Sequence, residues 1–125
     1  MRPLATSLVL AVLAAPVQGQ PLQVIGYAGV LGEWEVTASV TEQPSSGRGR
    51  DYAGSLTMKH TGICTRDGPE EKTGLIRLQL ASSRLTATLS VAGVDCTFSG
   101  KLADSYAGVM RCPDRKSVPL ELWVK

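Results

Sequence analysis

The chain has 125 residues, with 13 Lys and Arg residues against 11 Asp and Glu residues, and a formal net charge of +2. Nucleic-acid-binding domains are usually strongly basic, so this near-neutral balance makes nucleic acid an unexpected partner. The length fits one small domain, which buries a modest core and often needs a covalent cross-link. Two groups of basic residues, within 48–50 and 111–116, are interpreted as solvated surface because acids are interspersed elsewhere in the chain.

The N-terminus has the three parts of a secretory signal peptide. Arg2 supplies the positive charge, residues 4–15 form an apolar run, and small residues precede a cleavage point after Gly19. A transmembrane helix needs roughly 20 apolar residues, and this run is shorter. We therefore expect residues 1–19 to be removed, leaving a periplasmic or secreted protein with no transmembrane anchor.

After residue 30, apolar side chains recur at every second position, which is the pattern of half-buried strands. Seven segments show this alternation: 34–40, 52–58, 76–80, 85–91, 96–102, 106–112 and 120–124. Turn-forming residues separate them, for example at 44–47, 67–69, 92–93 and 113–114. The pattern predicts an all-β antiparallel up-and-down meander, closed as a barrel rather than folded as a sandwich. Residues 20–31 are expected to form an extra strand or a plug, and residues 32–125 the barrel domain.

An internal pattern of an aromatic residue, Gly and a large apolar residue at alternate positions occurs four times, at 27–31, 52–56, 98–102 and 106–110. Glycine inside a strand permits the sharp coiling that barrel closure needs. The aromatic ring two residues away lies on the same face, so it can cover the bare backbone. We interpret the pattern as a structural device.

The cysteines are expected to form one disulfide in an oxidising compartment. If residues 103–105 make a hairpin loop, Leu102 faces Tyr106, and counting back places Cys96 opposite Cys112. A Cys96–Cys112 bridge would contribute roughly 2–4 kcal/mol. The meander brings Cys64 to the same end of the barrel, so Cys64 is either another partner for one of these residues or a free thiol.

His60 is the single histidine and precedes Cys64 by four residues. One His and three Cys form a set that can bind zinc, but the close Cys-x-x-Cys pairs of ordinary zinc modules are absent, and no metal site is predicted. A hydrolytic triad would also need a nucleophile motif beside His60, and the sequence has none.

Two acidic pairs could in principle supply general acid chemistry. Glu33 and Glu35 point outward from a predicted strand, and residues 70–71 are expected in a loop with Lys72, so neither pair has the apolar setting that raises an acid's pKa. Phosphate, dinucleotide and calcium-binding motifs are absent from the sequence. The sequence therefore predicts a protein that is not an enzyme and uses no cofactor.

Several large side chains fall on the predicted inner face, around Gly54, Gly100 and Gly108. The candidate ligand-binding residues are Trp34, Tyr52, Met58, His60, Phe98, Tyr106 and Met110. An eight-stranded barrel is either just filled by its side chains or holds one small ligand. Both a hollow and a filled interior are compatible with this set.

Gly32-Glu33-Trp34, at the start of the first long strand, resembles the Gly-x-Trp opening of lipocalin-type and avidin-type (calycin-like) barrels. The resemblance covers three residues and the general architecture. It implies a small exported barrel that binds apolar or cofactor-like molecules, with Trp34 closing one end. The chain is shorter than an ordinary lipocalin and has two Trp residues, fewer than line an avidin pocket, so biotin is not the implied ligand.

Three functional hypotheses follow. The preferred one is an exported binding module for a small apolar ligand. The second is a proteinaceous inhibitor or envelope-interaction protein that meets an extracytoplasmic protein through residues 20–24 or the loop 62–73. The third is a thiol- or metal-dependent enzyme that uses Cys64 and His60.

Overall fold

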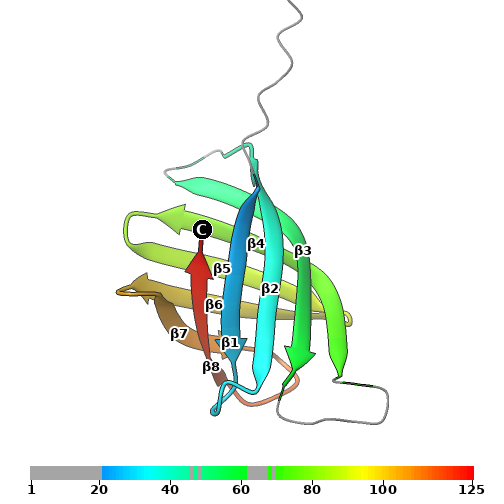
Figure 1. Ribbon diagram of the computed structural model, residues 1–125. Helices are drawn as coiled ribbons and strands as arrows, with labels where there is room; N and C mark the ends of the chain where they lie inside the picture. The colour runs from blue at the N-terminus through cyan, green and yellow to red at the C-terminus, as the bar shows by residue number, and fades with distance from the viewer. Residues whose placement is uncertain (1–20, 46, 48, 62–67, 69) are drawn as a thin grey trace, which may run out of the picture.

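The computed structural model describes residues 21–45, 47, 49–61, 68 and 70–125. Its eight strands are β1 (Leu22–Ala28), β2 (Trp34–Gln43), β3 (Arg50–His60), β4 (Glu71–Ala81), β5 (Arg84–Val91), β6 (Val94–Leu102), β7 (Tyr106–Arg111) and β8 (Val118–Val124). Each pairs antiparallel with the next, and β1 pairs with β8, so the sheet closes into a barrel (Figure 1). The predicted all-β antiparallel barrel is confirmed.

The N-terminal segment supplies the eighth strand. β1 fills the gap between β2 and β8, with Leu22 opposite Val40 and Val24 opposite Val124. The segment is therefore a barrel strand and not a plug. The expected signal peptide, residues 1–19, lies outside the described residues. In the part of the chain that the structure describes, no helix is long and apolar enough to span a membrane.

Alternate residues of each strand face the barrel interior, as the sequence pattern predicts. The core residues with at most 1% of their surface exposed are Val24, Ala28, Val36, Val40, Leu56, Ile76, Leu85, Leu89, Leu120 and Leu122. Burying a Leu or Ile side chain contributes about 1.5–3 kcal/mol relative to exposing it, and this supplies the driving force for closure.

The β6–β7 hairpin has the predicted register. Leu102 pairs with Tyr106, and Phe98 pairs with Met110. Two positions further on, Cys96 and Cys112 are joined by a disulfide with a Cα–Cα distance of 4.3 Å. The predicted Cys96–Cys112 bridge is confirmed. It uses both sulfurs, and the other proposed partner, Cys64, lies outside the described residues.

The space above two paired glycines of this hairpin is filled by an aromatic ring. Gly100 pairs with Gly108 across the two strands. A Cβ added to Gly100 would lie 2.6 Å from Cζ of Phe98, and one added to Gly108 would lie 3.1 Å from its Cε2. The ring therefore covers the bare backbone as expected. The copy at 27–31 differs, since Tyr27 faces outward and Gly29 lies in a turn with φ +104°.

β4 begins five residues earlier than the alternation predicted. Its first part pairs with β3, with Lys72 opposite Met58 and Glu71 opposite Lys59. Glu71 and Lys72 thus lie in a strand and not in the expected loop. The alternation is hidden because the inner positions here are occupied by Lys72 and Gly74, and neither is a large apolar residue.

The antiparallel order gives the barrel two distinct ends. The final residues of β1, β3, β5 and β7 meet at the end that carries the Cys96–Cys112 bond, here called the disulfide end. The hairpin turns at 82–83 and 103–105 lie at the opposite end, with the first residue of β1 and the C-terminus (Figure 1). This division decides which of the inward-facing residues can share a site.

Candidate functional site

The barrel encloses a cavity of about 300 Å³ at the disulfide end. Its walls are mainly apolar and sulfur-containing. They are formed by Ala28, Gly29, Trp34, Met58, Leu89, Val91, Ala92, Val94, Cys96, Met110, Cys112 and Val118, with Glu33, Lys72, Asp114 and Arg115 also contributing. The barrel interior is therefore filled in one region and hollow in another. The Phe98 ring fills the region above its glycines, and a space remains beside the disulfide.

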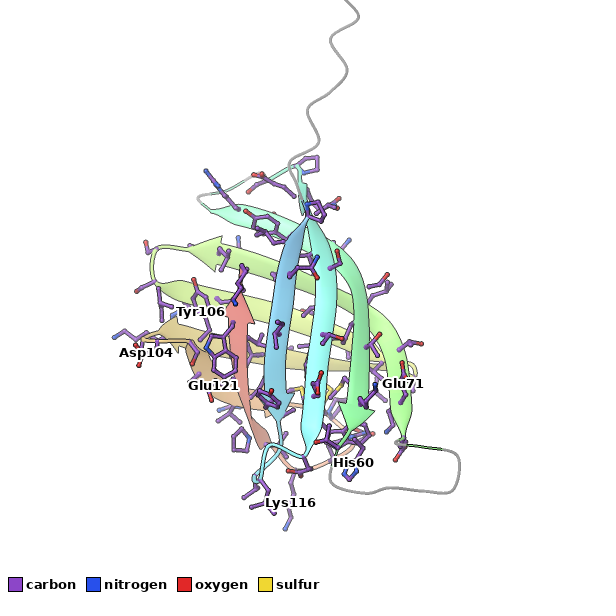
Figure 2. The ribbon with its side chains drawn as sticks, viewed as in Figure 1. His60, Glu71, Asp104, Tyr106, Lys116 and Glu121 are labelled. Carbon is purple, nitrogen blue, oxygen red and sulfur yellow. A yellow bond between two sulfur atoms is a disulfide. The ribbon has the colours of Figure 1, made fainter. Side chains whose placement is uncertain are left out.

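Trp34 stands between two other side chains at the mouth of this cavity. Its ring lies 4.6 Å from the His60 ring, centroid to centroid, at an interplanar angle of 73°. On β4, the Lys72 ammonium lies 5.2 Å from the centre of the Trp34 ring. A cation over an aromatic face is attracted by the ring's quadrupole. These contacts, at the end of the barrel where Figure 2 labels His60, hold the indole in place.

Backbone hydrogen bonds fix the segments on either side of Trp34. The carbonyl of Glu33 accepts bonds from the Thr61 amide at 2.7 Å and the Thr61 hydroxyl at 3.1 Å. The His60 amide donates to the carbonyl of Glu70 at 2.8 Å. These bonds hold the ends of β2, β3 and β4 together and so fix the backbone position of Trp34.

The acidic groups around the cavity already have partners. Glu33 accepts a bond from the Leu31 amide through Oε2 at 3.0 Å, so its carboxylate belongs to the β1–β2 turn. Asp114 accepts a bond from Nε of Arg115 at 3.1 Å, and this hydrogen bond lowers the pKa of Asp114. Lys72 has a weaker partner, because its Nζ lies 3.9 Å from Glu70, which is largely exposed. Lys72 is therefore the cation best placed to meet a ligand's charge.

The predicted ligand-binding residues do not form one site. Trp34, Met58 and Met110 line the cavity. His60 is not part of the lining, but its ring packs against that of Trp34. Phe98 is buried further along the barrel and fills core space.

Two other members of the predicted set lie far from the cavity. Tyr52 precedes Met58 by six strand positions, about 20 Å, so it lies towards the opposite end of the barrel. Tyr106 begins β7 at that same end.

No family model matches this sequence, and no curated protein or solved structure matches it either. The interpretation of the cavity therefore rests on its own residues. The resemblance of Gly32-Glu33-Trp34 to calycin-like barrels stays a prediction.

Sequence reasoning missed several members of the site. The sequence predicts Lys72 in a loop and gives Leu89 and Val91 only as strand residues, and Val118 precedes the last predicted strand, 120–124. The available signal was the position of each residue within its strand, because residues near the end of an odd-numbered strand or the start of an even-numbered one gather at the disulfide end.

The cysteine chemistry of the described residues is limited to the disulfide. Cys96 and Cys112 are both oxidised, so they cannot act as thiolate ligands in a zinc site with His60 and Cys64. No group of three or more His, Cys, Asp or Glu side chains positioned for a metal ion occurs in the described part of the chain.

Proposed function

We propose that this protein is an exported binding module that takes one small, mainly apolar ligand into the cavity at the disulfide end. The cavity itself carries the proposal: its volume of about 300 Å³ lies at the lower limit of ordinary ligand pockets. A disulfide fits an oxidising compartment, which supports a periplasmic or secreted location.

The residues that line the cavity favour an apolar ligand that is either flat or flexible. Met58 and Met110 offer polarisable, adaptable side chains, and Trp34 offers an aromatic face. Lys72, at the edge of that face, provides a position for one acidic group of the ligand. The ligand class proposed is therefore a small apolar molecule with a single negative charge.

Octanoate and its neutral counterpart octanol are suitable probes. In a W123F variant Trp34 is the single tryptophan, so its fluorescence reports on the cavity mouth. We expect octanoate to change this emission saturably and to bind more tightly than octanol. If neither octanoate nor octanol changes the emission saturably, the proposed ligand class is contradicted.

A matched pair of substitutions separates the cavity from the outer surface. V91F places a ring in the cavity wall, and L75F adds the same ring at an outward position that is 64% exposed. We expect V91F to abolish octanoate binding and L75F to leave it unchanged. An equal loss of octanoate binding in V91F and L75F would mean that octanoate binds outside the cavity.

A second function is supported by an exposed apolar tip beside the same cavity. Val30 and Leu31, in the β1–β2 turn, have 79% and 90% of their surfaces exposed. Large apolar side chains exposed together suggest a surface for an extracytoplasmic protein, as in the inhibitor or envelope-interaction hypothesis.

The segments that the sequence suggests for that role, residues 20–24 and the loop 62–73, fit it less well. Leu22–Val24 are paired within β1, residues 71–73 belong to β4, and residues 62–67 and 69 lie outside the described residues. The proposed contact is therefore the β1–β2 turn. A photo-crosslinking residue at Leu31, but not at the outward position Thr37, should give one adduct of fixed mass in exporting cells.

A further inference from the structure

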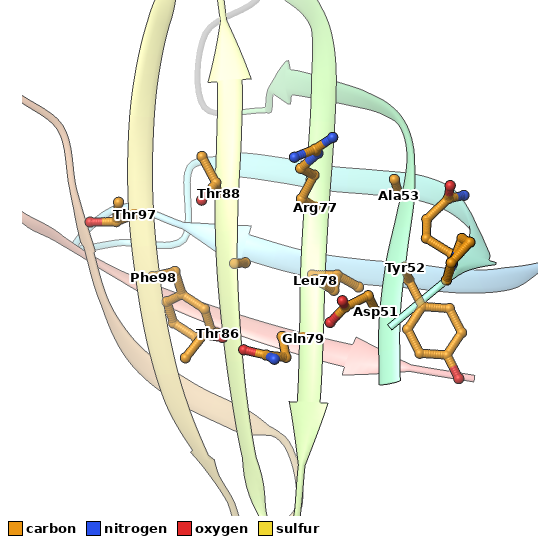
Figure 3. Close-up of a pocket in the computed structure, with 13 residues that line it drawn as sticks. Asp51, Tyr52, Ala53, Arg77, Leu78, Gln79, Thr86, Thr88, Thr97 and Phe98 are labelled. Carbon is orange, nitrogen blue, oxygen red and sulfur yellow. The ribbon is translucent and has the colours of Figure 1, made fainter. Parts of the chain in front are cut away.

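The outer surface of the barrel carries an open groove that crosses β3 to β7. It consists of two hollows, of about 780 Å³ and 460 Å³, which share Thr97 and Phe98 in their linings. Figure 3 shows outward side chains of the larger hollow on neighbouring strands, with Arg77, Thr88 and Thr97 side by side. This groove is separate from the ligand cavity.

The pairing register arranges the groove's polar side chains in rows across the strands. One row runs from Arg77 to Thr88, Thr97 and Arg111 on four successive strands. The next outward row contains Gln79, Thr86 and Ser99. Neighbouring strands lie about 4.8 Å apart, so the first row spans roughly 14 Å and presents hydroxyl groups between two guanidinium groups.

Two cations of this face, Arg77 and Arg111, are free to bind an external anion. Arg77 and Arg111 are exposed, and among the described residues neither makes a side-chain hydrogen bond or ion pair. Arg84 donates from Nη1 to the Ser99 hydroxyl at 2.9 Å and faces Lys101 across the β5–β6 pair. Four basic side chains from four strands therefore flank the hydroxyl rows.

The acids of this region lie at its borders. Asp51 lines the β3 side of the groove, and Glu121, on β8, accepts a hydrogen bond from Ser105 at 2.5 Å. On β4 to β7, the outward acids are Glu71 and Asp95, both near the disulfide end, and Asp95 accepts from Ser90 at 2.6 Å. On β4 to β7 the groove is consequently lined by basic and hydroxyl side chains and by no acid.

We propose that the groove binds an extended anionic polysaccharide. Its acid groups would meet Arg77 and Arg111, while its hydroxyls bond to the threonines between them. Arginine forms strong charge-assisted hydrogen bonds with sulfate and carboxylate groups. An open groove suits a chain that continues beyond the protein at both ends.

The lining argues against two other ligands. A neutral sugar usually needs an exposed aromatic face, but Tyr52 and Phe98 are only 7% and 3% exposed and belong to the core. A membrane surface would favour several apolar anchors, but among the described lining residues of the groove Val109, 44% exposed, is the one exposed large apolar side chain. Val30 and Leu31, which are more exposed, lie in the β1–β2 turn outside the groove. The basic side chains of the groove are therefore the groups expected to recognise the ligand, through its negative charge.

The test is titration with low-mass dextran sulfate, with neutral dextran and phosphatidylglycerol vesicles as comparisons, followed by calorimetry. We expect saturable binding of dextran sulfate that weakens as salt rises, and none to dextran. The R77Q/R111Q variant should bind at least about tenfold more weakly. K116Q/K125Q removes the same charge elsewhere and should change the affinity less than about twofold.

Two further variants keep the test independent of overall charge and folding. T88V/T97V removes the hydroxyl groups without changing charge and suits a strand, so it should weaken binding several-fold. D51N removes the groove's own acid and should strengthen binding. The proposal is overturned if dextran sulfate does not bind, if the two charge variants lose affinity equally, or if the vesicles bind as tightly through Arg77 and Arg111. None of these results bears on octanoate in the cavity.

Discussion

The ammonium group of Lys72 lies 5.2 Å from the centre of the Trp34 ring, and the two residues come from strands that do not pair with each other. β3 lies between them, with His60 opposite Trp34 and Met58 opposite Lys72. The contact therefore connects three strands at the cavity mouth. It also places a positive charge where an acidic ligand would enter.

Removal of this charge should distinguish acidic from neutral ligands. We expect K72Q to weaken octanoate binding by about twofold to fivefold, the range for a partly exposed ion pair, and to leave octanol binding unchanged. Isothermal titration calorimetry measures both. K59Q removes an outward charge from β3 and serves as the control. If octanoate and octanol lose affinity equally in K72Q, Lys72 supports the shape of the cavity and does not bind the acid.

The disulfide should make a large contribution to stability in so small a domain. It joins residues 16 positions apart, and a closed loop of this length contributes about 3 kcal/mol by restricting the unfolded chain. We expect C96A/C112A to lower the free energy of unfolding in urea by about 2–4 kcal/mol. A loss below about 1 kcal/mol would show that the β6–β7 register holds without the bond.

The hairpin register also predicts how the cysteines pair when one is removed. We expect C64A to retain the Cys96–Cys112 bond, because Leu102–Tyr106 and Phe98–Met110 already align the strands. The intact mass should be two hydrogens below that of the reduced chain, and no thiol should react with an alkylating reagent before reduction. Free thiols in folded C64A would contradict this pairing.

The sequence predicts the barrel well because each strand buries one face and exposes the other. The hairpin of β6 and β7 was predictable in register because a three-residue loop allows only one alignment of its residues. The first part of β4 was not predictable from alternation. Lys72 and Gly74 occupy its inner positions, one reaching the cavity mouth and the other packing against the backbone of Ser90.

The candidate site was harder to predict than the fold. Alternation tells which face a residue occupies, but it does not tell how far along the barrel the residue lies. Tyr52 and Met58 share a face of β3 and lie towards opposite ends. The outer groove is even harder to predict from the sequence than the cavity. Arg77 and Arg111 are 34 positions apart in the chain, and only three successive strand pairings align them.

Asp114 should titrate below its ordinary pKa of 3.8, mainly because Arg115 hydrogen-bonds to it. A lowered pKa in the folded state favours folding while Asp114 is ionised, and this effect is lost as the pH falls through the folded value. The carboxyl is exposed, so the site-specific measurement is an NMR titration. We expect R115Q to raise the pKa towards 3.8, whereas R111Q leaves it unchanged. An equal pKa in R115Q and the parent protein would exclude this hydrogen bond in solution.

The two glycines beneath Phe98 should respond differently to the same substitution. In G100A the new methyl group would contact Phe98, with Cζ at 2.6 Å and Cε1 at 3.0 Å, so a smaller side chain at position 98 can relieve it. In G108A the nearest atom is the backbone carbonyl oxygen of Ser99, which a change at position 98 does not move. Each substitution alone should destabilise the barrel by about 1–3 kcal/mol.

A double-mutant cycle with F98L tests this difference through the free energy of unfolding. Leucine is smaller than phenylalanine, so F98L/G100A should be more stable than the sum of the single changes predicts, by at least about 0.5 kcal/mol. F98L/G108A should be additive or worse, because the clash with the Ser99 backbone persists. Rescue of both glycine variants by F98L would mean that the ring alone requires glycine at these positions. Rescue of neither would mean that close approach of the strands is the sole reason.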